Sequence, residues 1–520
     1  MRMKIITSVQ AAAMVESGAT LCSQGMGGNN VAEELMLELE KRFLETGEPR
    51  DLRWFHSSGQ GDKGDRGLNH MAHPGLLAEI IGGHFGPAPK IQDLIAANQC
   101  RAYNLPQGVI SVMFRDIAGN RPTISRIGLR TFADPRVEGG KLNAITTEDI
   151  VEPIVIDGVE YLKYKHPARL DYAFLRGTYA DERGNISMEE EPCYLESLQA
   201  AQAVKNSGGK VIVQVKRVVQ TGTINPRLVH IPGTLVDYVV PVSDMDNHMM
   251  TFDTVFQPAY CGNCRQSVSF AAGDRKMDAK RIISRRAAME LKPDSIVNLG
   301  IGVPEGIGVV AEEEGLRESI TLSIESGPVG GIPASGIEFG ASLNPDAILD
   351  QSTQFDTYDG GGLDQAFLGL AEADGSGNVN VSKFGPKIAG AGGFINITQA
   401  TRNVIFCGTM TAGGLDVAVE DGKLRILREG KVKKLVRKVQ QITFSGDFAN
   451  ETKQHVLYIT ERAVFRLEAE GMHLVEIAPG LDLERDVLNQ MDFRPVVSPD
   501  LKTMDPCIFR DGPMELARKR

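Results

Sequence analysis

Apolar and polar residues alternate over 320–324, ITLSI, in the pattern of a half-buried strand. Ser326, Gly327 and Pro328 follow and predict a tight turn that ends this strand. Glu325 therefore stands between a predicted strand and its turn. Because charged residues in loops are mostly exposed, this local pattern alone predicts a solvated loop carboxylate.

Two other stretches run from a short apolar strand into a glycine cluster and then into a helix. They are 19–30, ATLCSQGMGGNN, and 295–306, SIVNLGIGVPEG. After the first, apolar residues recur every four positions from Val31 to Phe43, which predicts an amphipathic helix. Strand–turn–helix units in series predict a mostly parallel sheet with helices on both faces.

The chain also contains an internal repeat. Residues 173–187, AFLRGTYADERGNIS, align without a gap with 366–380, AFLGLAEADGSGNVN. We therefore predict two homologous open α/β domains, each with a mostly parallel sheet flanked by helices. The predicted bounds are 1–250 for the first half, which has an extra segment between about 65 and 165, 251–280 for a linker, and 281–520 for the second half.

The repeat places Ser57 opposite Glu325. In the first half, 55–61, FHSSGQG, corresponds to 323–330, SIESGPVG, in the second. Both halves share the turn, so the turn serves backbone geometry, whereas the fold does not require the glutamate. A residue that differs between two copies of one scaffold is a candidate for function. Glu325 is therefore a functional candidate, with a solvated loop carboxylate as the alternative.

Composition narrows the class of protein. A chain of 520 residues is too long for one core, and its 42% hydrophobic and 24% charged residues are typical of a globular protein. A net charge of −11 argues against nucleic acid as a partner. No apolar stretch is long enough for a membrane span or a signal peptide. Seven scattered cysteines favour a reducing compartment, so we predict a complete, cytoplasmic chain.

Neither the cysteine nor the histidine pattern predicts a metal site. Cys261 and Cys264 have the spacing of a redox pair or of half a zinc site, but no second pair follows, which favours a structural role. His70 and His73 lie three residues apart, with no acidic ligand close to them in the sequence. We therefore predict that no metal is bound.

Five stretches together resemble the coenzyme A transferases, over effectively the whole chain. They are 25–30, 298–306, 324–331, 359–380 and 392–397. The chain is most similar to the bacterial short-chain acyl-CoA transferases of the acetate, propionate or acetoacetate type. The related succinyl-CoA:3-ketoacid enzymes usually carry Glu-Asn-Gly where this chain has Glu325, Ser326 and Gly327.

The resemblance implies that Glu325 is the nucleophile of a CoA-transferase. A carboxylate with a reference pKa of about 4.3 is ionised at neutral pH and needs no general base. Its attack on an acyl-CoA would give a mixed anhydride and then a glutamyl-CoA thioester, with ping-pong kinetics. The implied substrates are a short-chain acyl-CoA and acetate, propionate, butyrate or acetoacetate. CoA would be a transient covalent carrier, and no other cofactor is expected.

Several glycines are candidates for the rest of the site, with a purely structural turn as the equal alternative for each. Backbone N–H groups of glycine-rich loops are suited to stabilise an oxyanion. The oxyanion candidates are Gly392, Gly393, Gly413 and Gly414. Glycine loops that open onto helices bind anions such as CoA phosphates. The CoA- or substrate-binding candidates are Gly25, Gly27, Gly28, Gly300, Gly302 and Gly327.

Some alternatives stay open at this point. An acyl-CoA hydrolase would use the same thioester and let water complete the reaction. A non-catalytic CoA- or sugar-phosphate-binding regulator on the same scaffold would be expected to lack Glu325. Asp364 stands where the 3-ketoacid enzymes carry Asn and is expected to be a solvated loop charge. The resemblance also implies a homodimer or homotetramer, without indicating which.

Overall fold

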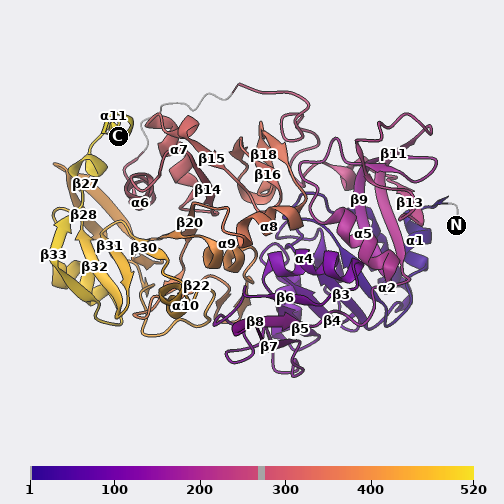
Figure 1. Cartoon of the computed structure of the whole chain (residues 1–520), viewed down its shortest axis with the longest axis horizontal. Helices are drawn as coiled ribbons and strands as arrows, with labels where there is room; N and C mark the ends of the chain where they lie inside the picture. Colours follow the sequence, from indigo (N-terminus) through magenta and orange to yellow (C-terminus); the bar gives the residue numbers. More distant parts are fainter. Residues whose placement is uncertain (1–2, 268–275, 520) are drawn as a thin grey trace. The chain divides into compact units, whose positions relative to one another are not determined.

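The computed structural model describes residues 3–267 and 276–519. It contains two large sheets with helices packed beside them (Figure 1), so the predicted α/β class with mostly parallel sheets is confirmed. The predicted linker 251–280 includes 268–275, which lie outside the described residues. Within the described residues, no helix combines the length and the apolar character needed to cross a bilayer.

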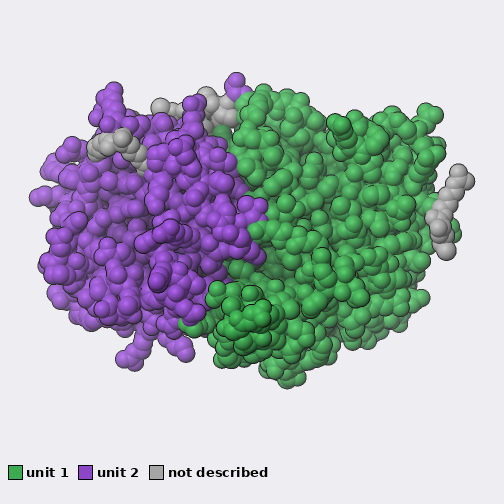
Figure 2. All heavy atoms as spheres, in the orientation of Figure 1, with its two compact units in different colours: residues 1–266, 324–356, 384–396 green, residues 267–323, 357–383, 397–520 purple. Residues whose placement is uncertain are grey.

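The chain divides into two compact units, which Figure 2 shows in different colours. Unit 1 contains Met1–Gln266, Ile324–Asp356 and Phe384–Asn396. Unit 2 contains Ser267–Ser323, Thr357–Lys383 and Ile397–Arg520. Glu325 thus packs with unit 1, although the strand before it belongs to unit 2. This division describes packing, whereas the predicted halves describe repetition of sequence, so the two halves stay a prediction.

Unit 1 is built on a ten-stranded sheet. Its strands follow the order β1-β13-β11-β9-β2-β3-β4-β5, with all of these neighbours parallel, and β10 and β12 add an antiparallel extension beside β9. The strands are β1 (Lys4–Ile5), β2 (Thr20–Ser23), β3 (Leu52–His56), β4 (Leu77–Gly82), β5 (Arg101–Asn104), β9 (Tyr172–Asp181), β10 (Ile186–Ser187), β11 (Lys210–Val219), β12 (Val229–Ile231) and β13 (Tyr238–Pro241).

Helices cover both faces of this sheet, as the alternation of residues in β3 shows. Trp54 belongs to the same buried cluster as Leu35 of α2, whereas the neighbouring Phe55 has its ring 4.9 Å from that of Phe114 in α4. Successive residues of a strand point to opposite faces, so α2 and α4 lie on opposite sides. The helices are α1 (Ser8–Ala13), α2 (Glu33–Thr46), α3 (Pro89–Ala96), α4 (Gln107–Ala118) and α5 (Ser197–Asn206).

A separate three-stranded antiparallel sheet lies within the extra segment predicted between about 65 and 165. It has the order β6-β8-β7. Its strands are β6 (Thr123–Ser125), β7 (Val151–Ile156) and β8 (Val159–Tyr164).

Unit 2 is built on an eight-stranded sheet with the order β15-β14-β20-β25-β30-β31-β32-β33. The first five strands are parallel, and β31 and β32 then run antiparallel to their predecessors. The strands are β14 (Ser295–Leu299), β15 (Ile320–Leu322), β20 (Gln365–Gly369), β25 (Asn403–Cys407), β30 (His455–Ile459), β31 (Ala463–Glu468), β32 (Gly471–Ile477) and β33 (Val496–Thr503). The remaining α-helices are α6 (Ala279–Ala288), α7 (Glu305–Glu313), α8 (Gln351–Asp359), α9 (Phe394–Ala400), α10 (Gly446–Glu451) and α11 (Leu516–Lys519).

The repeated stretches form the same turn. Asp181 Oδ1 accepts hydrogen bonds from the backbone N–H groups two and four residues later, and its Oδ2 accepts from the Asn185 amide. Asp374 makes the three equivalent bonds, with Asn378 in the place of Asn185. The short aspartate side chain replaces a backbone acceptor in both turns. The two copies therefore agree in detailed geometry as well as in sequence.

A buried cluster of charges fixes α2 to the segment that follows β3. His70 Nε2 lies 2.8 Å from Glu33 Oε1, and the other ring nitrogen bonds Glu40, which also bonds His73. The two histidines thus have acidic neighbours after all, from a helix some thirty residues earlier in the chain. Burial alone would lower the pKa of His70, but its two glutamate partners outweigh burial and raise this pKa to about 9.

The stability of unit 1 should therefore fall at alkaline pH. A histidine whose pKa is raised on folding stabilises the folded state fully below its unfolded pKa of about 6.5, and this contribution is lost as pH rises through about 9. We expect a loss on the order of 1–3 kcal/mol between pH 6.5 and 10. Urea unfolding followed by the fluorescence of Trp54, the single tryptophan, measures it.

The matched variant is His70→Gln. It should be less stable than the wild type at pH 6.5, and its stability should depend less on pH over the same range. Parallel pH dependences for the two proteins would contradict the assignment of the charge to His70.

Candidate active site

Glu325 is held in a tight turn directly after the end of β15. The Ile324 N–H donates to the Pro328 carbonyl at 3.1 Å, and the Gly327 N–H donates to the Ile324 carbonyl at 3.1 Å. The Ser326 hydroxyl donates to the Gly340 carbonyl at 2.6 Å. Glu325 is only 8% exposed, so the local expectation of a solvated loop carboxylate is wrong. The predicted turn is present, and it presents a largely buried carboxylate.

Gly327 is required by the backbone that packs against this turn. Its φ is +124°, and its carbonyl accepts a 3.0 Å hydrogen bond from the Leu349 N–H. A Cβ at this position would stand 2.0 Å from the Leu349 carbonyl oxygen. No side chain fits there, because the obstacle is backbone, so only glycine permits this turn. The residue predicted as a substrate contact therefore has a structural use.

Gly393, in the glycine pair before α9, lies beside Glu325. A Cβ on Gly393 would stand 3.3 Å from both Cγ and Oε1 of Glu325. The Gly392 N–H donates to the Gly83 carbonyl at 2.8 Å, whereas the Gly393 N–H has no acceptor among the described residues. Of the four predicted oxyanion candidates, these two belong to the same unit as Glu325. A backbone donor beside the carboxylate is what an oxyanion site needs.

Gln107, the first residue of α4, was missed by the sequence reasoning. Its backbone N–H donates to the Gly392 carbonyl at 3.1 Å, and its side-chain Oε1 lies 3.5 Å from where a Cβ on Gly392 would be. The residue is 2% exposed, yet its side-chain Nε2 has no hydrogen-bond partner in the described part of the chain. A buried amide without a partner is costly, which points to a use for this donor. The available signal was one polar residue between a proline and an apolar helix.

Ser57 directly follows β3 and is connected to Gly392 by backbone hydrogen bonds through Gly83. Its carbonyl accepts from the Gly83 N–H at 3.0 Å, and Gly83 in turn accepts from Gly392. Its hydroxyl donates to Glu196. The neighbouring His56 is fully buried, and burial lowers its pKa to about 4, so this imidazole is neutral at neutral pH. Ser57 of the first repeat is therefore connected to Glu325 of the second by two backbone hydrogen bonds, Ser57–Gly83 and Gly83–Gly392, and by the packing of Gly393 on Glu325.

The first glycine cluster is used by the fold. The Gly27 N–H donates to the Gly59 carbonyl at 2.8 Å, and the Gly28 N–H donates to the Ile337 carbonyl at 3.0 Å. At Gly25, a Cβ would stand 2.8 Å from both Gln60 and Val31 side-chain atoms. These contacts hold the segment near 337–340 that anchors Ser326. A role of these glycines in CoA binding stays a prediction.

The remaining candidates belong to unit 2. Gly300 follows β14 and donates its N–H to the Phe367 carbonyl at 2.8 Å, while Gly302 has φ +90° and open space around it. Gly413 and Gly414 form the turn after β26 (Thr411–Ala412). Asp364 is exposed, and its side chain accepts from the Ile296 N–H at 2.8 Å. The roles of the four glycines in catalysis or CoA binding stay predictions.

Cys261 and Cys264, which have the spacing of a redox pair, are both free thiols. Within residues 3–267 and 276–519, no group of three or more His, Cys, Asp or Glu side chains is arranged to hold a metal ion.

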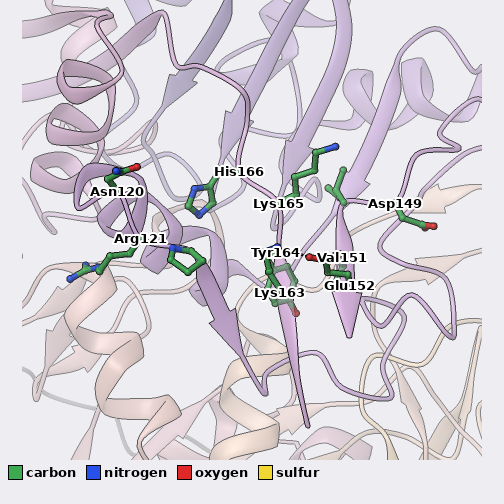
Figure 3. Close-up of a pocket in the computed structure, with 11 residues that line it drawn as sticks. Asn120, Arg121, Asp149, Val151, Glu152, Lys163, Tyr164, Lys165 and His166 are labelled. Atoms are coloured by element: carbon green, nitrogen blue, oxygen red, sulfur yellow. Dashed lines mark hydrogen bonds and ion pairs between the residues drawn. The ribbon is translucent and has the colours of Figure 1, made fainter. Parts of the chain in front are cut away.

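A cavity of about 590 Å³ also lies in unit 1 (Figure 3). It is lined by the loop after α4, the start of β7 and the end of β8. None of the candidate residues lines it. Lys163 and Glu152, both on its wall, pair with each other at 2.6 Å, as the close-up shows. These two charges thus neutralise each other within the protein.

Comparisons with known proteins agree on one family. A family model described as coenzyme A transferase matches residues 5–241. Caffeate CoA-transferase of Acetobacterium woodii is 46% identical over 98% of each chain. Acetate CoA-transferase YdiF of Escherichia coli K12 is 44% identical over 99% of this chain and 96% of its own. The crystal structure of the acyl-CoA transferase YdiF of E. coli O157:H7 as a thioester complex with CoA has a TM-score of 0.93 at 42% identity and covers 99% of this chain and 97% of its own.

The packing of Gly327 can be tested by adding one methyl group. Gly327→Ala places a Cβ against the Leu349 carbonyl oxygen and should destabilise unit 1 by more than about 2 kcal/mol. Gly302→Ala is the matched control, because it also has positive φ but meets no atom within 4 Å. Urea unfolding of both variants measures the difference. Equal, small losses would show that the turn tolerates a side chain.

Proposed function

The chain belongs to the coenzyme A transferase family and is an acyl-CoA:carboxylate CoA-transferase, and on that premise we propose that Glu325 is its nucleophile. The observation that carries this proposal is the packing of the Glu325 carboxylate against Gly393 in a turn that only glycine permits. The Glu325 carboxylate is held there against the Gly393 backbone. The sequence resemblance assigns the same residue.

The proposed reaction balances without a proton donor. A Glu325 oxygen attacks the thioester carbonyl, the C–S bond breaks, and a mixed anhydride and CoA thiolate result. The thiolate attacks the Glu325 carbonyl, which releases the donor acid as its carboxylate and leaves a glutamyl-CoA thioester. The acceptor carboxylate then repeats these steps in reverse and restores Glu325. Each intermediate is an activated acyl group, so little free energy is lost between steps.

Each addition step develops an oxyanion, for which we propose the Gly393 N–H and the Gln107 side-chain amide as donors. Gly393 packs on the Glu325 carboxylate, the Gln107 side chain lies near the adjoining Gly392, and neither donor has a partner among the described residues. The Gly392 N–H is less suited, because it already donates to Gly83. Gly413 and Gly414 stay alternative donors, and Gly300 and Gly302 stay proposed contacts of CoA.

We propose short-chain acids as substrates: acetate, propionate, butyrate or acetoacetate. The resemblance noted in the sequence supports this choice. Two relatives of nearly equal identity are named for caffeate and for acetate, so overall identity does not decide the size of the acid. Competition among these four acids and caffeate as acceptors in one assay separates the alternatives. In this scheme CoA is the transient carrier, and no further cofactor takes part. On the resemblance alone, we also propose a cytoplasmic homodimer or homotetramer.

The role of Glu325 can be tested with its amide isostere. Glu325→Gln removes the nucleophilic charge and should lower transfer by more than about 100-fold while the protein still folds. Glu318→Gln, at an exposed glutamate shortly before β15, is the matched control and should be fully active. Both are assayed by formation of new acyl-CoA from an acyl-CoA and a second acid. Retention of more than a few per cent of activity by Glu325→Gln would refute the assignment.

The same assay separates a transferase from a hydrolase. With acyl-CoA alone, the wild type should not release CoA continuously, because the proposed cycle needs an acceptor acid. Initial rates at several concentrations of both substrates should give the parallel lines of a ping-pong mechanism. Steady release of CoA without an acceptor, and no new acyl-CoA with one, would favour the hydrolase.

The proposed oxyanion donor can be tested by truncation. Gln107→Ala removes a side-chain amide that contacts only the transition state in this scheme, so it should lower kcat by roughly 100-fold and change KM little. Gln99→Ala, at an exposed glutamine, is the control. A rise in KM with unchanged kcat would instead assign Gln107 to substrate binding.

A further inference from the structure

Glu196 is a buried carboxylate that the proposed reaction does not use. It is 1% exposed and stands immediately before α5. The Ser57 hydroxyl donates to its Oε1 at 2.7 Å, and the Gln351 side-chain amide donates to its Oε2 at 3.1 Å. The same amide donates to the Ser57 oxygen at 3.1 Å, and its own oxygen accepts from the Ser58 hydroxyl at 3.1 Å. All four residues are buried, so the network is shielded from water.

The network is connected to the segment 349–351, which hydrogen-bonds the Gly327 turn. The Gln351 backbone N–H donates to the Leu195 carbonyl at 2.8 Å, directly beside Glu196. Two residues before Gln351, the Leu349 N–H donates to the Gly327 carbonyl at 3.0 Å. A displacement of Gln351 would therefore be passed to the turn that carries Glu325.

The network is also connected to the Gly392–Gly393 loop. The Ser57 carbonyl accepts from Gly83, and the Gly83 carbonyl accepts from Gly392. Gly393 follows and packs on the Glu325 carboxylate. The Gly327 turn and the Gly392–Gly393 loop are thus both connected to the hydrogen bonds among Ser57, Glu196 and Gln351.

We propose that Glu196 is a positioning residue for CoA transfer, because as a shared acceptor of Ser57 and Gln351 it sets the spacing between the Glu325 turn and the Gly392–Gly393 loop. This proposal rests on the assignment of Glu325 as the nucleophile. It explains why a glutamate occupies a site where a neutral residue would cost less to bury. Misplacement of reacting groups by about 1 Å can cost roughly 100-fold in rate, so a change of spacing is enough to matter.

The protonation state of Glu196 gives the proposal its distinctive signature. Burial raises the pKa of Glu196 to about 7, the Ser57 hydrogen bond opposes this shift, and Asp350 adds to it. The thiols of Cys22 and Cys193 also face Glu196, but burial raises their pKa, so they are neutral. The Ser57 hydroxyl and the Gln351 amide both donate hydrogen bonds to the Glu196 carboxylate. A proton on Glu196 would displace one of these two donors. Activity should therefore fall as pH decreases through about 7.

Stability should respond in the opposite sense. A glutamate whose pKa is raised on folding is more costly to bury when it is charged, so its contribution to stability becomes less favourable as pH rises from about 4.3 through about 7. A neutral replacement should therefore leave stability at pH 8 unchanged or increased. A residue that only supported the fold would show a loss.

The test compares Glu196→Gln with the wild type between pH 6 and 8.5. We expect kcat at pH 8 to fall by about 10- to 100-fold, KM for both substrates to change by less than about twofold, and the acid limb near pH 7 to disappear. Urea unfolding at pH 8 should show no loss of stability. Glu182→Gln, at an exposed glutamate, is the control. A variant with the kcat and pH profile of the wild type would overturn the proposal.

A second variant covers the case in which Glu196→Gln does not fold. Gln351→Met keeps Glu196 and removes the amide that joins it to the Gly327 side, and it should also lower kcat with little change in KM. Unchanged kcat in this variant would overturn the proposal as well.

The assay of Glu325→Gln distinguishes failure of the positioning role from failure of the proposed function. If Glu325→Gln is inactive and Glu196→Gln is normal, only the positioning role fails, whereas an active Glu325→Gln removes the proposed function itself.

Discussion

The close approach of backbone to backbone around Glu325 is the constraint on which the rest of the site depends. A nucleophilic carboxylate has to be charged, largely withdrawn from water and still in reach of a carbonyl carbon. Here Leu349 presses on Gly327 from one side, and Gly393 packs on the carboxylate from the other. Any Cβ at Gly327 would collide with the Leu349 carbonyl, so the proposed chemistry needs a glycine at this position as much as it needs Glu325.

Two buried glutamate clusters in unit 1 show how differently the protein treats such charges. Glu33 and Glu40 face His70, whose pKa they raise, so opposite charges compensate each other and tie α2 in place. Glu196 faces a serine hydroxyl and a glutamine amide, and burial raises its own pKa. The first cluster stabilises the fold. The second has a cost in stability and is best explained by what it positions.

Much of the fold was predictable because it rests on local periodicity. The apolar stripe of α2, the glycine after β2 and the aspartate turns at Asp181 and Asp374 each have a signature within a few residues. Glu325 became the candidate nucleophile because the repeat opposed it to Ser57 and because its neighbourhood resembles a known family. Its burial was not predictable, since that comes from Gly393 and Leu349, which are distant in sequence.

The residues that sequence reasoning missed share one property. Gln107, Glu196 and the acidic partners of His70 are ordinary polar residues whose meaning arises from contacts across 30 to more than 150 positions. No local pattern marks such pairs. Conversely, Gly27 and Gly28 have the local pattern of an anion-binding loop, but their N–H groups are used by Gly59 and Ile337.

The covalent intermediate on Glu325 is the most direct test of this account. The protein is incubated with an acyl-CoA and no acceptor, treated with borohydride, digested, and the peptide that contains Glu325 is weighed by mass spectrometry. We predict that Glu325 is reduced to the alcohol only after incubation with acyl-CoA, because borohydride reduces a thioester and spares a carboxylate. An unchanged Glu325 in fully active protein, or reduction at a different residue, would contradict the account.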